Sequence, residues 1–144
     1  MIKLIAKFGG ILILIAIGIL FLRGSVLSSS PWAIAFQLLA IGLVIWARAT
    51  FLGQQFKVTA DPGSGQLLQR GPYRFIRHPM YLAALLFVWA SIISHWSLLN
   101  LFIGFLVVII LIIRIHVEEG LLREKYPEYQ EYARKTKRFI PFIW

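Results

Sequence analysis

The fourth apolar stretch of the chain reads LLNLFIGFLVVIILIIRI from Leu98 to Ile115, and only Asn100 and Arg114 in it are strongly polar. A helix of about 20 apolar residues crosses the hydrocarbon core of a bilayer, so this stretch predicts a transmembrane helix. Three further apolar stretches have the same character, at residues 4–22, 32–51 and 80–93. These patterns predict an all-α integral membrane protein with four transmembrane helices.

Composition excludes the common classes of soluble protein. Of the 144 residues, 59% are hydrophobic and the mean hydropathy is +0.77, whereas soluble domains are about 45–50% apolar. The formal charge of +9 comes from basic residues that lie between apolar runs, so we expect no nucleic-acid partner. The chain has no cysteine, which removes thiol nucleophiles and cysteine-ligated metals, and we expect no metal site. Its length predicts one domain over residues 1–144.

Positive charge predicts the orientation of the helices, because basic residues near helix ends are retained on the cytoplasmic side. With four spans, every one of the 15 basic residues except Arg23 falls on the same side of the membrane, and so do all 6 acidic residues. We therefore predict a multi-pass protein of the cytoplasmic (inner) cell membrane with both termini cytoplasmic. Polar chemistry is then confined to two cytoplasmic segments, residues 53–79 and 116–144, the second of which ends in a helical tail.

The first cytoplasmic segment leads into the sequence RHPMY, of which Tyr81 is the last residue. Proline is favoured in the first turn of a helix, so the third transmembrane helix should begin at Pro79, with His78 immediately before its N-terminus. The exposed amides of that helix end, together with His78, Arg74 and Arg77, predict an anion-binding site. Tyr81 lies one turn deeper on the same face as His78. The structural alternative is a proline-started helix whose arginines reach lipid phosphates.

The second cytoplasmic segment begins where the fourth helix leaves the bilayer. Arg114 and Glu118 are four residues apart, so they share one face of a helix. Ionisable groups at a membrane boundary are costly and mark functional sites, which makes these two residues and Glu119 candidates for the chemistry. The alternative is an ordinary surface ion pair.

Aromatic side chains recur through the tail. They are Tyr126, Tyr129, Tyr132, Phe139, Phe142 and Trp144. Tyrosine and tryptophan concentrate at membrane interfaces, so the simplest interpretation is an aromatic belt that lies on the membrane.

The two polar segments together resemble a known family. The motifs that carry the resemblance occur in a fixed order: Gly71-Pro-Tyr73, Arg77-His-Pro79, Tyr81, Glu118-Glu119, Leu122, Tyr129, Tyr132 and Arg138-Phe-Ile-Pro141. Over roughly residues 65–141, more than half of the chain, this order is similar to that of the isoprenylcysteine carboxyl methyltransferase family. The wider superfamily includes the membrane phospholipid N-methyltransferases.

The resemblance implies an integral-membrane enzyme that binds S-adenosylmethionine, methylates a lipophilic acceptor at the cytoplasmic face and releases S-adenosylhomocysteine. The cofactor contacts that it implies are Gln66, Leu67, Leu68, Tyr73, His78, Pro79, Met80, Tyr81 and Glu118. Arg114 matches an arginine of the family that faces the acceptor. The implied partners are a prenylated or other lipophilic small molecule and membrane lipid.

The chemistry of the acceptor decides the roles of two further candidates. S-adenosylmethionine brings its own electrophile, so the protein only has to align it with the acceptor in a dry site. A carboxylate acceptor, such as that of an isoprenylcysteine, can be oriented by Arg114 and needs no base. An amine acceptor, as in phospholipid N-methylation, needs deprotonation, for which Glu119 is the candidate base.

Two other classes compete with methyl transfer. A membrane sterol or enoyl reductase that uses NADPH has a similar Arg-His-Pro stretch. There we expect an Asn-Tyr pair followed by an acidic residue, where this chain has the apolar Met80-Tyr-Leu-Ala83. A small membrane protein that binds anionic lipid through its basic face would explain the charge but not Glu118 and Glu119 beside Arg114. Neither the identity of the acceptor nor the oligomeric state follows from the sequence.

Overall fold

The computed structural model describes residues 2–27, 30–50 and 67–139, with side chains from residue 8 onward. Within these ranges the chain forms helices and no strand, which confirms the all-α prediction. In chain order the elements are α1 (Ile2–Leu22), α2 (Pro31–Ala49), the 3-10 helix η1 (Gly71–Arg74), α3 (Pro79–Ser94), α4 (Leu98–Lys125) and α5 (Tyr129–Lys135). The predicted end of the second span, at residue 51, lies outside the described residues.

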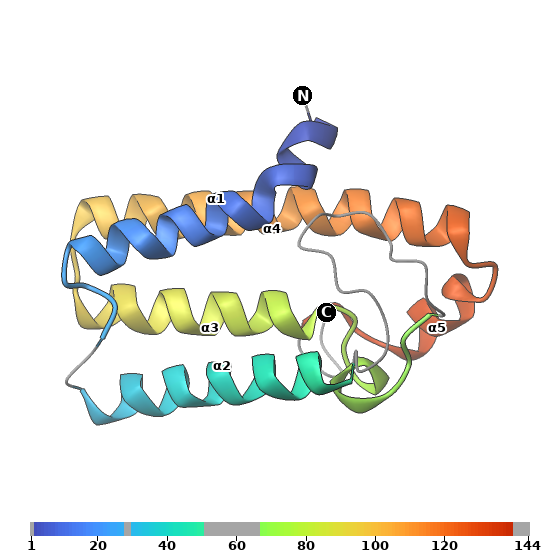
Figure 1. The fold of residues 1–144 in the computed structure, drawn as a ribbon, viewed down its shortest axis with the longest axis horizontal. Helices are drawn as coiled ribbons and strands as arrows, with labels where there is room; N and C mark the ends of the chain where they lie inside the picture. Colours follow the sequence, from blue (N-terminus) through green and yellow to red (C-terminus); the bar gives the residue numbers. More distant parts are fainter. Residues whose placement is uncertain (1, 28–29, 51–66, 140–144) are drawn as a thin grey trace.

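The four long helices lie side by side and form a bundle (Figure 1). α1 packs against α4 and α2 against α3, while α3 also contacts α4 and so joins the two pairs. α3 and α4 run antiparallel, as the short connection between them predicts. The short helix α5 lies at the end of the bundle where α4 ends.

Small side chains let neighbouring helices approach closely. Ala33, Ala40 and Ala47 recur on one face of α2 and are all buried. On α4, a β-carbon added at Gly104 would lie 2.5 Å from Cδ1 of Ile92 on α3, so this glycine permits the contact between the two helices. Close approach through small residues is typical of helix packing in membranes.

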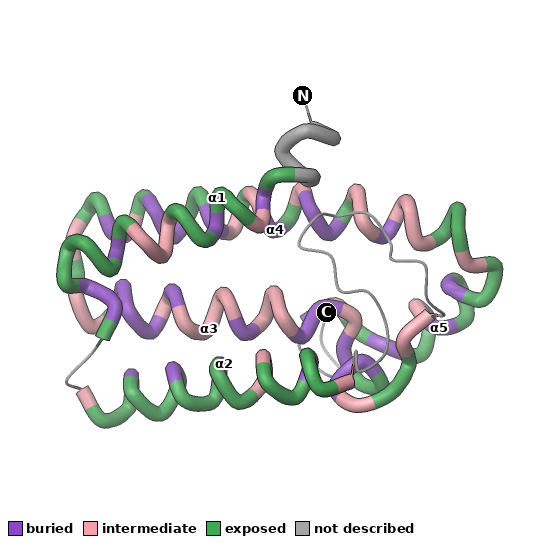
Figure 2. The backbone as a smooth tube through the Cα atoms, in the orientation of Figure 1, coloured by how far each residue is buried: buried purple, intermediate pink, exposed green. Residues whose placement is uncertain are grey.

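Much of each long helix is exposed (Figure 2), and the exposed side chains include many large hydrophobic ones. Large hydrophobic side chains are exposed on every long helix, among them Phe21, Leu38, Ile93 and Phe102. Soluble monomers rarely expose contiguous apolar surface on this scale, so the surface suits a bilayer. α2 and α4 are long and apolar enough to cross a membrane, whereas α3 and the Phe8–Leu22 part of α1 are shorter apolar helices. Two helices thus support membrane association, and the crossing of all four stays a prediction.

α4 does not end where its apolar stretch ends. The helix continues to Lys125, which agrees with the shared helix face expected for Arg114 and Glu118, while the exit from the membrane predicted at Ile115 stays a prediction. The first strong helix breaker after the apolar part is Pro127, which explains the extra length. Glu118 and Glu119 therefore lie on a helical extension of α4, beyond its apolar part.

The end of the bundle remote from α5 is closed by polar side chains. Gln37 on α2 donates hydrogen bonds to Ser91 on α3, over 3.0 Å, and to the carbonyl of Val26. Arg23, the one basic residue that departs from the charge asymmetry, donates to Asn100 of α4 over 3.2 Å. The buried amides of Gln37 and Asn100 thus have partners, as apolar surroundings require.

Single cysteines placed at Leu27 and Lys125 test the predicted topology, because the chain has no cysteine of its own. Both positions are exposed, and they lie at opposite ends of the bundle. In intact cells, a membrane-impermeant thiol reagent should label position 27 and should reach position 125 only after the membrane is opened. Labelling of both positions from one side would contradict the four-span topology.

Candidate functional site

The predicted cytoplasmic end of the bundle is assembled from the residues before α3, the end of α4, and α5 with the residues that follow it. The chain after α5 pairs with the chain before α3 in one parallel β-bridge, between Ile76 and Lys137. The Arg77 amide donates to the Lys137 carbonyl over 2.7 Å, and the His78 amide donates to the Arg138 carbonyl over 3.1 Å. The C-terminal segment is therefore held directly beside the start of α3.

Glu119, on the extension of α4, is the centre of this end. It is 2% exposed, and arginines from three segments contact its carboxylate. Arg77 Nε lies 3.0 Å from Oε1, and Arg138 Nη2 lies 2.9 Å from Oε2. Arg123 Nη2 lies 3.4 Å from Oε2, and His78 Nε2 lies 3.5 Å from Oε1. One carboxylate thus connects α4, the start of α3 and the C-terminal segment.

The groups around Glu119 keep it ionised. Burial raises the pKa of a carboxyl group, but the contacts with His78 and Arg138 and the charge of Arg77 outweigh burial and hold the pKa of Glu119 well below its ordinary value. A general base must accept a proton near neutral pH, so this environment is unsuited to the base expected for an amine acceptor. The geometry favours a structural role for Glu119.

Arg77 points into the protein rather than toward a ligand. Its guanidinium donates to the carbonyls of Ala133, over 2.8 Å, and Thr136 at α5, besides contacting Glu119. Arg74 is exposed on the surface. The prediction that both arginines line an anion site is therefore wrong for Arg77, because a buried carboxylate and the carbonyls of α5 bind its donors.

Tyr81 links the candidate residues of α3 and α4. Arg114 Nε donates to the Tyr81 hydroxyl over 3.1 Å, and that hydroxyl donates to Oε2 of Glu118 over 2.5 Å. The rings of His78 and Tyr81 are stacked, with centres 5.3 Å apart and planes within 3°. The structure thus brings these four side chains together, and their roles toward ligands stay predictions.

Arg114 is enclosed by its neighbours. The residue is 3% exposed, and its guanidinium carbon lies 5.5 Å from the centre of the Tyr81 ring. α1 passes close to it at Gly9, where an added β-carbon would lie 2.7 Å from Arg114 Cδ. Glycine therefore allows α1 to cover this arginine, and a charge shielded from water acts strongly on any group placed beside it.

Two tyrosines of the predicted aromatic belt are buried instead. Tyr129 and Tyr132 are 1% and 6% exposed, and the Tyr132 hydroxyl donates to the Tyr73 carbonyl over 2.7 Å. The belt interpretation is wrong for both, and also for the buried Phe139, because one face of α5 and the residues after it pack onto the chain before α3. Burial raises the pKa of Tyr132 to about 12, so its hydroxyl keeps its proton at neutral pH.

The remaining predicted cofactor residues precede α3 or lie in its first turn. Tyr73 and Pro79 are buried. Three others are half-buried: Leu67, Leu68 and Met80. Gln66 lies outside the described residues. In the part of the chain that the structure describes, no group of three or more potential metal ligands occurs.

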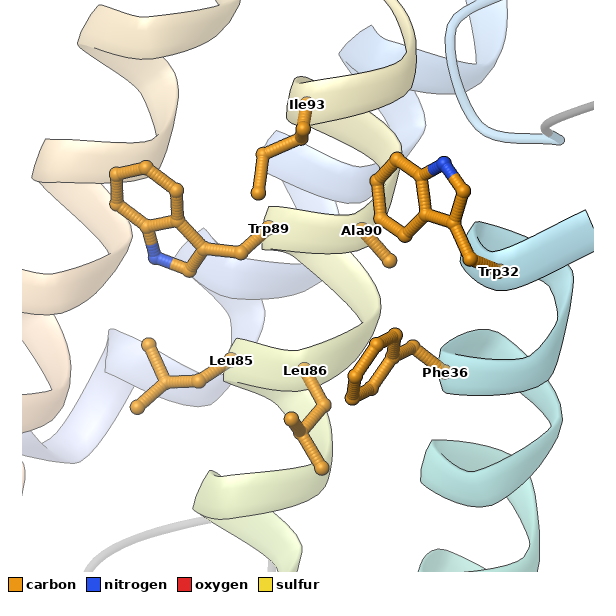
Figure 3. Close-up of a pocket in the computed structure, with 7 residues that line it drawn as sticks. All are labelled: Trp32, Phe36, Leu85, Leu86, Trp89, Ala90 and Ile93. Atoms are coloured by element: carbon orange, nitrogen blue, oxygen red, sulfur yellow. The ribbon is translucent and has the colours of Figure 1, made fainter. Parts of the chain in front are cut away.

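An apolar groove of about 230 Å³ lies along α3, away from the polar residues (Figure 3). Trp32 and Phe36 of α2 line one side, and side chains of α3 between Leu85 and Ile93 line the rest. Leu85 follows Tyr81 by about one helical turn. Leu85 is therefore the lining residue nearest to Tyr81 in the sequence, and the groove extends from it toward the Ile93 end of α3.

Comparison with protein families matches a large part of the chain. A family model described as phospholipid methyltransferase matches residues 32–129, about two-thirds of the chain. The matched range contains all of α2 but its first residue, together with α3 and α4, and it includes the linked side chains of Tyr81, Arg114 and Glu118. A comparison with curated proteins gave no match.

Replacing Glu119 with glutamine should destabilise the protein, because three arginines lose their shared counter-charge. Removing one partner of a buried ion pair costs about 3–5 kcal/mol, which thermal unfolding in detergent can measure. The pKa of Glu119 in the folded protein lies below its ordinary value of 4.5, so its contribution is complete above that pH and is lost only in stronger acid. The difference between wild type and Glu119→Gln should stay constant from neutral pH down to that value and then shrink.

Glu131→Gln is the matched control. It removes the same charge from a pair with Lys135 in which both side chains are 71% exposed. Exposed pairs contribute little, so the unfolding temperature should not change. Equal effects of the two substitutions would contradict the central place of Glu119.

Proposed function

The chain belongs to the phospholipid methyltransferase family, and on this premise we propose that it transfers a methyl group from S-adenosylmethionine to a lipophilic acceptor at the cytoplasmic face of the membrane. The observation that carries this proposal is the linked set in which Tyr81 joins Arg114 to Glu118 and stacks on His78. In this set one side chain, Tyr81, lies between the shielded cation of Arg114, which we assign to the acceptor, and Glu118, which we assign to the cofactor.

The residues fit S-adenosylmethionine, which carries a carboxylate, an ammonium group and ribose hydroxyls. Nε2 of His78 is buried 3.5 Å from Oε1 of Glu119 and makes no hydrogen bond within the described residues, so we assign to it a hydrogen bond to the cofactor's carboxylate. Glu118 is half-exposed and can accept a ribose hydroxyl or the ammonium group. Leu67 and Leu68, both half-buried, would flank the adenine.

The protein's own part in the reaction is to bind and orient. When bound, S-adenosylmethionine supplies a methyl group on a sulfonium, which needs no protein nucleophile. Arg114 can hold both oxygens of a carboxylate acceptor through its planar guanidinium. The Tyr81 hydroxyl fixes that guanidinium by accepting from Nε. Because Arg114 is almost completely buried, the groups that it orients would be shielded from bulk water.

A carboxylate acceptor, such as that of an isoprenylcysteine, suits these residues better than an amine. Methylation of a carboxylate needs no base, whereas a protonated amine must first lose a proton. Glu119 is the base expected for an amine, and its lowered pKa makes it a weak proton acceptor. Its environment therefore supports the carboxylate acceptor over phospholipid N-methylation.

The apolar groove supports the lipophilic character of the acceptor. We assign it to the hydrocarbon chain of that acceptor, because it begins about one turn from Tyr81 and its lining residues are apolar or aromatic. From Tyr81 to Ile93, α3 extends about 18 Å at 1.5 Å per residue. A chain lying along this path would keep the acceptor's polar end beside Arg114.

Arg114→Lys should separate the acceptor from the cofactor. Lysine keeps the charge but loses the planar fork, so transfer of labelled methyl to a prenylcysteine should fall at least tenfold, about 1.4 kcal/mol at the transition state. Calorimetry in detergent should find unchanged binding of S-adenosylhomocysteine. The wild-type product should release labelled methanol in alkali, as a methyl ester does and an N-methylated lipid does not.

Glu118→Ala should show the opposite pattern and weaken S-adenosylhomocysteine binding by about 1–3 kcal/mol, because a charged group loses its partner. Glu124→Ala, at an exposed position of the same helix, is the control and should change neither quantity. If Arg114→Lys abolished cofactor binding while turnover per bound cofactor stayed unchanged, the division of roles would be wrong.

A further inference from the structure

α1 approaches Arg114 closely at Gly9, which is buried. A β-carbon added at Gly9 would lie 2.7 Å from Cδ and 3.0 Å from Cγ of Arg114, and 3.0 Å from Cγ2 of Ile110. Carbon atoms that are not bonded to each other pack at about 3.5–4.0 Å, so a methyl group has no room here. The absence of a side chain at Gly9 therefore lets the backbone of α1 lie against the aliphatic part of Arg114.

Arg114 cannot move away from α1 without losing its contacts with α3. Its Nε donates to the Tyr81 hydroxyl over 3.1 Å, and its guanidinium carbon lies 5.5 Å from the centre of the Tyr81 ring. The side chain is almost completely buried, so other atoms already fill the space beside it. Arg114 thus meets α1 through Cγ and Cδ and meets α3 through its guanidinium group.

Apolar packing holds α1 against α4 next to this contact. Ile13, about one helical turn after Gly9, is buried in one cluster with Val107 and Leu111 of α4. Tyr81 packs against the same cluster. The part of α1 that meets Arg114 is therefore fixed relative to the two helices that carry the proposed site.

We propose that Gly9 is a positioning residue for methyl transfer, because it lets α1 pack on Cγ and Cδ of Arg114 and so sets where the guanidinium lies. The inference rests on the proposed function, in which Arg114 orients the acceptor. It adds to that function a helix outside the range matched by the family, which begins at residue 32. A misplacement of about 1 Å can slow a reaction about a hundredfold, so the width of one methyl group matters here.

Gly9→Ala in the full chain tests this role. The added methyl group should displace the guanidinium, so kcat/KM for a prenylcysteine should fall at least about fivefold. The Kd for S-adenosylhomocysteine should stay unchanged, because Gly9 acts on the acceptor's side of the site. Gly18→Ala is the matched control on the same helix, since an added β-carbon there has no atom within 4 Å, and it should change neither value. Wild-type kcat/KM in Gly9→Ala would overturn the proposal.

A second control separates positioning from loss of stability. Asn100→Ala removes a buried amide that donates to the His95 carbonyl over 2.6 Å. Asn100 precedes Arg114 by about 21 Å along α4. This variant should lower the unfolding temperature and leave kcat/KM unchanged at temperatures well below unfolding. An equal loss of kcat/KM in Asn100→Ala and Gly9→Ala would show that activity follows stability alone and would overturn the positioning role.

A double variant distinguishes the two neighbours of Gly9 and serves also if Gly9→Ala does not fold. Gly9→Ala combined with Ile110→Ala removes Cγ2 of Ile110, which makes room between the helices, but keeps the methyl group against Arg114. Relative to Ile110→Ala alone, the double variant should show the same loss of kcat/KM. Full recovery would show that the effect passes through Ile110 and would overturn the proposal.

Failure of this inference is distinguishable from failure of the proposed function. In each contrary result above, the wild type still binds S-adenosylhomocysteine and methylates the prenylcysteine, so the proposed function stands. A wild type that does neither would overturn the proposed function and, with it, the role of Gly9.

Discussion

The buried carboxylate of Glu119 holds the predicted cytoplasmic end of the molecule together. Arg77 reaches it from the start of α3 and Arg138 from the C-terminal segment, at 3.0 and 2.9 Å. These contacts lie on a helical extension of α4 that carries Glu118 one residue earlier. The arrangement of the candidate site therefore depends on this ion-pair cluster together with the buried aromatic face of α5.

One chain of hydrogen bonds connects the two halves of the proposed reaction. Arg114 lies at the end of the apolar part of α4, and Glu118 lies about one helical turn beyond it. The Tyr81 hydroxyl stands between them, accepting from Arg114 and donating to Glu118. A lipophilic acceptor that approaches from the bilayer and a polar cofactor that approaches from the cytoplasm would then meet at a single side chain. Placing both reactants is the main task of a methyltransferase whose cofactor already carries the electrophile.

Much of the fold follows from the sequence, because apolar stretches and prolines mark helices locally. Pro79 begins α3 as predicted, and the all-helical class is confirmed. The motif order also indicated that Tyr81 and Glu118 belong to one site. The inward turn of Arg77 and the contact of Arg138 with Glu119 did not follow from the sequence, because side-chain direction depends on partners far along the chain. The buried tyrosines carried a local signal: Tyr129, Tyr132 and Thr136 recur at helical spacing, which is typical of a packed face.

The most direct test of the account is calorimetry of the detergent-solubilised full chain with S-adenosylhomocysteine and, separately, with NADPH. The linked set of His78, Tyr81, Arg114 and Glu118 is proposed to bind a methyl donor, so the account predicts saturable binding of S-adenosylhomocysteine and none of NADPH. Binding of NADPH without binding of S-adenosylhomocysteine would contradict the account and would favour a membrane reductase.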